Sequence, residues 1–242
     1  PMEITLDLTG HDLVPDVYQV TVVGNPIATR GLSFDGTDDY VSIPDSNSLD
    51  LTQRVTIEAW IKFAVDPSTI SGRWLFVVDK REAWRLWYSP AGDGASDADQ
   101  FFFDLWEWHG PNTKGIQWLA DTWYHLAATY DGSVAKIYVN GELNNQVSVT
   151  KTLWTSNLPL TIGSISNGTS DSFPGHIDDV HIWSSSRTPE EIRADMVAQL
   201  TGNETNLVGC WQMEEGSGQT LLDVTPNQNH GTLGPLRWSA WA

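Results

Sequence analysis

Hydrophobic and polar residues alternate along several short stretches of the chain. The clearest is VTIEAWIKFAV (55–65), in which one set of alternate positions is apolar and the other is mostly polar. An alternation with a period of two places successive side chains on opposite faces of a strand, so it predicts a β-strand with one buried face. The same pattern predicts further strands over residues 74–80, 83–89, 100–108, 122–132, 135–149, 158–165 and 175–184.

Turn and helix signals separate these strands. Asn140-Gly141 is typical of a two-residue hairpin, because both central positions of a type I′ turn need a positive φ. The stretch SRTPEEIRADMVAQL (186–200) predicts a short helix, with Thr188 as N-cap and Pro189 at the first helical position. Many short strands with one helix predict an all-β fold, a two-sheet antiparallel β-sandwich, and we expect a single domain over residues 1–242.

Composition and charge narrow the classes of function. The chain has 242 residues, of which 40% are hydrophobic, enough for a large core. Its formal net charge of −18 argues against nucleic acid and against an anionic membrane surface as partners. No run of about 18 apolar residues is present, so we expect no membrane insertion. Cys210 is the single cysteine, which excludes an internal disulfide.

One acidic stretch, GLSFDGTDDYVSIPD (31–45), carries four aspartates among strand-forming residues. Either these carboxylates form Asx turns with nearby backbone N–H groups, or a cation lies among them. Ca²⁺ is the cation that takes six to eight oxygen ligands from carboxylates, carbonyls and water. Farther along the chain, Asp178 shares the alternation phase of Val180 and Ile182 and should point inward, where a carboxylate needs a partner or a metal.

Four segments of the chain together resemble a known family. They are LSFDGTDDYVSIPDSNSLDLTQRVTIEAWIKF, WYHLAATYDGSVAKIYVNGE, LPLTIGS and GHIDDVHIWSSSRTPEEIRADM. The resemblance is to the laminin-G-like jelly-roll domains of the concanavalin A-like lectin/glucanase group. It implies two antiparallel sheets, and a carbohydrate-binding or adhesion module within a larger secreted or cell-surface multidomain protein. Some relatives on this fold are glycosidases or polysaccharide lyases, so the fold alone does not decide function.

The resemblance also implies a structural calcium ion between the strand after FDG and the late IDDV strand. Transferred to this sequence, the candidate ligands are the carboxylates of Asp35, Asp39 and Asp178, with the carbonyls of Gly36 and His176. The ion would tie an early strand to a late one.

The Trp-rich segment from Ser71 to Lys114 matches the family pattern least, so we expect the protein's own binding function there. Tryptophan rings stack on sugars, while acidic, Arg and His side chains bind hydroxyl groups. Along the predicted strand 100–108, Trp106 and Trp108 share a face with Asp104. The candidate ligand-binding residues are Trp84, Arg85, Trp87, Asp104, Trp106, Trp108 and His109. The alternative is that these tryptophans fill the sandwich core.

Three basic residues, Lys80, Arg81 and Arg85, also gather in this segment of an otherwise acidic chain. They are candidates for recognising a carboxylate or sulfate on a glycan, although an arginine near acids more often forms a surface ion pair.

Three classes of function follow from these patterns. We favour a non-catalytic carbohydrate-binding or adhesion module that recognises an extracellular polysaccharide. The alternative is a glycan-cleaving enzyme, either a glycoside hydrolase or a polysaccharide lyase, although the Glu-x-Asp-x-x-Glu pattern of the fold's glucanases is absent. A structural spacer in a cell-surface array is the third. No catalytic residue is assigned.

Overall fold

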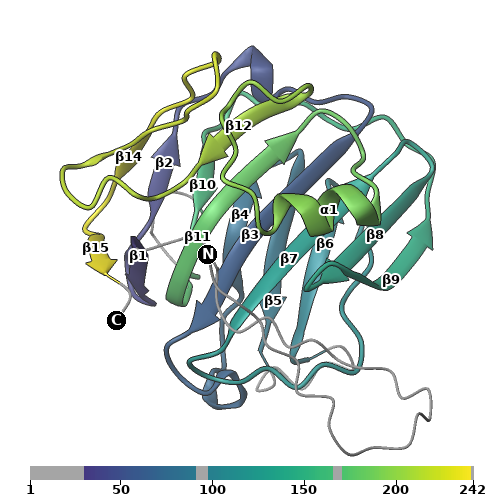
Figure 1. The fold of residues 1–242 in the computed structure, drawn as a ribbon. Helices are drawn as coiled ribbons and strands as arrows, with labels where there is room; N and C mark the ends of the chain where they lie inside the picture. The colour runs from purple at the N-terminus through teal and green to yellow at the C-terminus, as the bar shows by residue number, and fades with distance from the viewer. Residues whose placement is uncertain (1–29, 91–97, 166–170, 241–242) are drawn as a thin grey trace, which may run out of the picture.

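Two antiparallel sheets face each other in the computed structural model (Figure 1), which describes residues 30–90, 98–165 and 171–240. The eight-stranded sheet has the order β15 (Arg237–Ala240), β1 (Arg30–Asp35), β11 (Pro174–Trp183), β3 (Val55–Phe63), β7 (Trp123–Tyr130), β8 (Val134–Val139) and β9 (Glu142–Ser148), with β12 (Leu207–Trp211) also paired to β11. The seven-stranded sheet has the order β13 (Thr220–Leu221), β14 (Gly231–Leu233), β2 (Val41–Ile43), β10 (Leu160–Ile162), β4 (Leu75–Lys80), β5 (Trp84–Ser89) and β6 (Gln100–Leu105).

The predicted two-sheet sandwich with one short α-helix is confirmed within the described residues. The helix is α1 (Pro189–Asp195), and two 3₁₀ turns, Asn47–Leu49 and Pro67–Thr69, accompany it. The prediction of one domain over residues 1–242 includes residues 1–29, which lie outside the described residues. Within the described residues, the first strand, β1, is hydrogen-bonded to the last strand, β15. No helix in these ranges has the length and apolar character needed to cross a membrane.

Alternation along the strands builds a single core between the sheets. In β3, Ile57 and Ile61 point into the core, and the same holds for Trp84 and Leu86 in β5 and Phe103 in β6. Each of these side chains is fully or almost fully buried. The residues between them therefore lie on the outer faces of the sheets, where any ligand surface must be sought.

Local sequence signals place the connections. Asn140 and Gly141 have φ values of 50° and 78°, so the predicted type I′ hairpin joins β8 to β9. Thr188 caps α1 in a capping box with Glu191. The helix then packs Ile192 against Ala127 and Tyr138, so it covers the outer face of the eight-stranded sheet (Figure 1).

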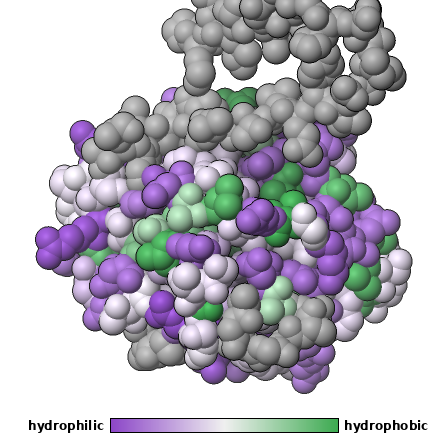
Figure 2. Space-filling view, turned by 90° about the horizontal axis from the view of Figure 1, so that it is seen from below, coloured by the Kyte–Doolittle hydropathy of each residue, from purple (hydrophilic) through white to green (hydrophobic). Residues whose placement is uncertain are grey.

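The sandwich shows a mixed surface at the end seen in Figure 2. Hydrophobic residues form separate green patches among hydrophilic ones in the described part of that view. An extended apolar surface, typical of an obligate protein interface, is therefore not seen on this face.

Gly163, directly after β10, offers a test of the packing between the sheets. Its φ is +82°, and a Cβ added there would lie 2.0 Å from Cε1 of core residue Phe34. We expect Gly163→Ala to lower the free energy of unfolding by roughly 3 kcal/mol, because backbone strain and overpacking add. Gly72→Ala is the matched control: its φ is +75° and nothing lies within 4 Å, so only the strain of about 1 kcal/mol is expected. Denaturant titration measures both, and equal losses would contradict this account of the packing.

Candidate functional site

A row of polar side chains crosses the outer face of the seven-stranded sheet. Pairing places Thr161 of β10 opposite Asp79 of β4, Asp79 opposite Arg85 of β5, and Arg85 opposite Asp104 of β6. All four point outward, because their neighbours along each strand belong to the core. Arg85 therefore lies between two acidic side chains, Asp79 on β4 and Asp104 on β6.

Asp104 is the hydrogen-bonding centre of this row. Its Oδ2 accepts from Nε and Nη2 of Arg85 at 3.2 and 3.1 Å, and from Nε1 of Trp87 at 2.7 Å. Nδ1 of His109 lies 3.2 Å from the same oxygen, and the backbone N–H of Gly110 donates to Oδ1 at 3.3 Å. Only 2% of Asp104 is exposed, so these contacts replace the hydration that its carboxylate loses.

Asp79 is buried without such contacts. It is 1% exposed, and neither carboxylate oxygen has a hydrogen-bond partner among the described residues. Burial raises the pKa of Asp79 to about 6, although Arg85 and Arg81 act in the opposite direction. An unpaired buried carboxylate is costly, and such groups are commonly found at functional sites.

An aromatic ladder lies beside the polar row. The ring of Trp87 stacks on Phe102 at 4.6 Å between centroids and lies 6.2 Å from Phe76. Trp74, which is 49% exposed, lies against the same indole at 5.2 Å. The guanidinium of Arg85 lies over the Phe76 ring at 5.7 Å. The ladder therefore begins under the polar row and ends in a solvent-exposed indole at Trp74.

A tight turn after β6 forms the other side of the site. Leu105 and Trp108 exchange two backbone hydrogen bonds, of 3.2 and 2.8 Å, and Glu107 has a φ of 62°. The turn is held in place by the N–H of Trp106, which donates to the carbonyl of Ala83, and by Lys151, which donates to the carbonyl of Trp106. A cavity of about 270 Å³ opens here and is lined by Arg85, Asp104, Leu105, Trp106, Glu107, Trp108 and His109.

Five of the seven candidate ligand residues line this cavity: Arg85, Asp104, Trp106, Trp108 and His109. The other two are corrected by the structure. Trp84 is 1% exposed and points into the core, and Trp87 is 5% exposed beneath the ladder, so neither offers a free ring face.

The expected strand over residues 100–108 is also corrected. It ends at Leu105, so Trp106 and Trp108 lie on the two sides of a turn rather than on one strand face. Trp74 was not among the candidates. Its signal in the sequence is its place immediately before a strongly apolar strand, where the alternation leaves it outside the core.

Of the three basic residues, Lys80 is fully buried rather than available to a ligand. Its ammonium group binds the carboxylate of Asp45 and the carbonyls of Ser156 and Leu158. It fastens the segment after β9 to the end of β4.

The other sheet offers no comparable site in the described ranges. Its outer face carries Glu58, His125 and His181, all buried. Burial raises the pKa of Glu58 and lowers the pKa of His125 to about 3. Nε2 of His125 lies 3.4 Å from Glu58. Because α1 packs over this sheet, these groups belong to an internal polar layer rather than to a ligand surface.

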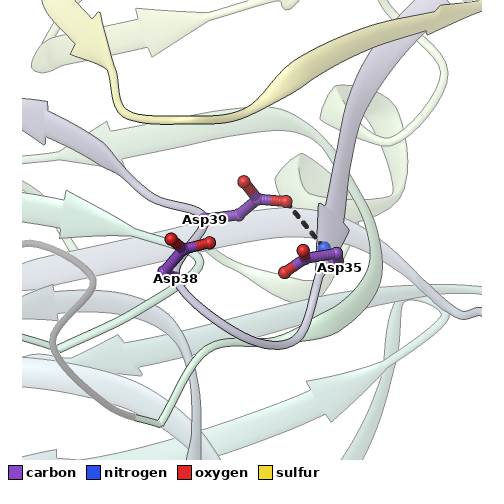
Figure 3. A group of neighbouring side chains, drawn as sticks. All are labelled: Asp35, Asp38 and Asp39. Carbon is purple, nitrogen blue, oxygen red and sulfur yellow. Dashed lines mark hydrogen bonds between the residues drawn. The ribbon is translucent and has the colours of Figure 1, made fainter.

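The acidic stretch forms a separate cluster in the loop between β1 and β2 (Figure 3). One carboxylate oxygen from each of Asp35, Asp38 and Asp39 lies within 4.8 Å of the others. The N–H of Asp35 donates to Oδ2 of Asp39 at 2.7 Å, and the N–H of Thr37 donates to Oδ1 of Asp35 at 2.7 Å. Burial raises the pKa of Asp39, and the charges of Asp35 and Asp38 act in the same direction.

The predicted calcium ligands do not all converge here. Asp35 lies opposite Pro174 in the pairing of β1 with β11, and Asp178 is four residues farther on, about 13 Å along the strand. His176 lies opposite Ser33, and the carbonyl of Gly36 accepts from Arg73. The carboxylates that do come together are those of Asp35, Asp38 and Asp39, so Asp38 takes the place expected of Asp178.

The amino-acid sequence is similar to a protein family and to two curated proteins. A laminin-G-like family model, described as "Concanavalin A-like lectin/glucanases superfamily", matches residues 35–193. Pappalysin-1 of Mus musculus is 24% identical over 182 residues, which are 69% of this chain and 11% of the mouse protein. Pappalysin-1 of Homo sapiens is 24% identical over 214 residues, 78% of this chain and 13% of the human protein. The chain thus spans a small part of the length of these curated relatives.

Solved structures share the fold. A candidate carbohydrate binding protein from Bacteroides ovatus superposes with a TM-score of 0.73 at 20% identity, covering 88% of this chain and 60% of that chain. The ligand binding domain of botulinum neurotoxin serotype D, solved in complex with N-acetylneuraminic acid, superposes with a TM-score of 0.50 at 13% identity, covering 67% of this chain and 40% of that chain. At these identities the likeness shows the fold.

The buried carboxylate of Asp79 predicts a pH-dependent gain of stability on its removal. Below the usual pKa of 3.8 the group is protonated whether the chain is folded or unfolded, so it costs nothing; as the pH rises through about 6, the folded state bears the full cost of an ionised buried group, roughly 3 kcal/mol. We expect Asp79→Asn to be more stable than the wild type by about 1–3 kcal/mol at pH 7 and by less than about 1 kcal/mol at pH 4, measured by urea unfolding.

The matched control is Glu107→Gln, which removes an exposed carboxylate and should change the unfolding free energy by less than about 0.5 kcal/mol. An Asp79→Asn variant that is less stable than the wild type at pH 7 would contradict this prediction, because it would show that the carboxylate has a stabilising hydrogen bond or ion pair.

Proposed function

Because the chain belongs to the laminin-G-like family of the concanavalin A-like lectin/glucanase superfamily, we propose that it is a non-catalytic carbohydrate-binding or adhesion module. Its ligand is an extracellular polysaccharide, which binds on the outer face of the seven-stranded sheet. The observation that carries the proposal is the cavity in which Trp106 and Trp108 stand beside Arg85, Asp104 and His109. Ring faces beside fixed polar groups are the usual composition of a sugar site.

The dimensions favour an extended chain over a single terminal sugar. Trp74 precedes β4, whose first residue pairs with Tyr88, while Trp106 is hydrogen-bonded to Ala83 at the other end of β5. Five residues of strand separate these positions, about 17 Å. Several sugar units are needed to cover that distance, so we propose that Trp74 and the Trp106 turn are two stacking platforms of one binding surface.

The relatives support this function and its setting. The Bacteroides ovatus protein is a candidate carbohydrate binding protein, and the neurotoxin domain is solved in complex with N-acetylneuraminic acid. The curated relatives are much longer than this chain, which agrees with a domain inside a larger multidomain protein. We therefore place the protein outside the cell, either secreted or at the cell surface.

Substitution of the exposed indole of Trp74 and the partly exposed indole of Trp106 tests the proposed surface. A shallow platform gives modest affinity, on the order of 10⁻³ to 10⁻⁵ M, or about −4 to −7 kcal/mol. We expect Trp106→Ala and Trp74→Ala each to weaken binding at least tenfold in isothermal titration calorimetry, while the unfolding free energy changes little. The titrants are oligosaccharides from whichever polysaccharide retards the wild type in affinity electrophoresis.

Trp123→Ala is the matched control, because this partly exposed indole lies on β7 of the other sheet, against Lys62. Wild-type affinity in both test variants would place the site elsewhere. New reducing ends or unsaturated uronates released by the wild type would replace the binding function with the alternative, glycan cleavage.

We also propose that the loop between β1 and β2 holds a structural Ca²⁺ ion, with Asp35, Asp38 and Asp39 as the carboxylate ligands. Three oxygens within 4.8 Å, one of them from a buried carboxylate with a raised pKa, match the hard oxygen donors that calcium requires. The alternative is that the backbone hydrogen bonds of Asp35 and Asp39 alone hold the loop.

Calcium addition tests this second proposal. Millimolar Ca²⁺ on a micromolar site should raise the unfolding free energy by roughly 4 kcal/mol, and a chelator should remove the gain. We expect Asp39→Asn to abolish the calcium-dependent shift in Tm, whereas Glu142→Gln, which removes an exposed acid on β9, should keep it. An identical Tm in calcium and in chelator would contradict the site.

A further inference from the structure

Among the residues that line the cavity, Arg85 is the one with a permanent positive charge. This charge is already paired with the carboxylate of Asp104. Nε and Nη2 both donate to Asp104, and the guanidinium plane lies over the rings of Phe76 and Trp87. An anionic ligand would have to compete for Arg85 with a carboxylate that is 2% exposed and already accepts two of the guanidinium donors. Weakening this contact takes the ion-pair partner from a buried carboxylate, which is unfavourable.

The other cations near the cavity are engaged as well. Lys151 donates to the carbonyl of Trp106, and the ammonium group of Lys80 is buried against Asp45. Arg81 also has a partner. None of these basic groups presents an unused charge to the cavity in the described structure.

Two acidic residues, Asp79 and Glu107, differ from these cations. Asp79 lies next to Arg85 in the polar row, and its buried oxygens have no partner in the described residues. Glu107 is exposed at the turn and lines the cavity. Glu107 can accept hydrogen bonds from a ligand, and the negative charge of both groups repels anions. The formal net charge of −18 adds a long-range repulsion of polyanions.

Resting on the proposed function, we propose that this site selects uncharged polysaccharides and rejects those that carry uronate or sulfate groups. Sugar hydroxyls can donate to the exposed carboxylate of Glu107 and accept from His109, while the sugar rings stack on the indoles. Rejection follows from like charge and from the absence of an unused cation. This replaces the expectation that Lys80, Arg81 and Arg85 recognise an acidic glycan.

Affinity electrophoresis with chemically matched polysaccharides tests the selection. Each pair differs mainly in charge: hydroxyethyl cellulose against carboxymethyl cellulose, methyl-esterified against de-esterified homogalacturonan, and desulfated against sulfated galactan, all in 150 mM salt. We expect the neutral member of at least one pair to retard the protein, with the acidic member of that pair at least tenfold weaker.

Two variants test whether these residues cause the discrimination between neutral and acidic polysaccharides. Asp104→Asn should release Arg85 and reduce the discrimination at least threefold. Glu107→Gln, on an exposed turn residue that leaves the fold intact, should reduce it in the same direction by a smaller factor. Glu190→Gln is the matched control, because it removes the same charge from α1 over the other sheet.

The outcomes separate the two proposals. Acidic members that bind as well as or better than their neutral partners overturn the selection and leave the binding function standing. A wild type retarded by no polysaccharide overturns the binding function, and the selection falls with it. An unchanged neutral-to-acidic ratio in both site variants contradicts the assignment of the selection to these carboxylates.

Discussion

The carboxylate of Asp104 is the contact on which the candidate site depends. It joins Arg85 and Trp87 of β5 to β6, and it holds His109 and Gly110 at the start of the segment that returns along the sheet edge. A buried acceptor with this many donors restrains the groups around it, because moving any of them takes a hydrogen bond from a buried charge. The aromatic ladder and the cavity are thus parts of one rigid surface.

The two outer faces of the sandwich carry different chemistry for a simple reason. The helix α1 packs over the outer face of the eight-stranded sheet, and Glu58, His125 and His181 on that face are buried. The face of the seven-stranded sheet has an exposed indole and an open cavity, and it tolerates the buried, unpartnered Asp79. Groups that weaken a fold are expected near functional sites, and Asp79 lies next to Arg85 of the cavity.

Much of the fold could be predicted from local sequence patterns. The alternation in β3, the Asn140-Gly141 hairpin and the Thr188 cap each depend on neighbours in sequence, and the structure agrees with all three. The failures depend on distant contacts. The turn after β6 contains no glycine or proline that would predict it. The positive φ in this turn belongs to Glu107. The separation of Asp178 from Asp35 follows from the register of β1 on β11, which no local pattern specifies.

The central claim is that a polysaccharide lies on the outer face of the seven-stranded sheet, across Trp74 and the Trp106 turn. Indole N–H resonances report on this directly, because each tryptophan contributes one signal that can be assigned by substitution. We predict that titration with oligosaccharides from the retarding polysaccharide shifts the signals of Trp74, Trp106 and Trp108 and leaves those of Trp123 and Trp183 on the other sheet unchanged. Shifts confined to Trp123 or Trp183, with Trp74 and Trp106 unmoved, would contradict the account.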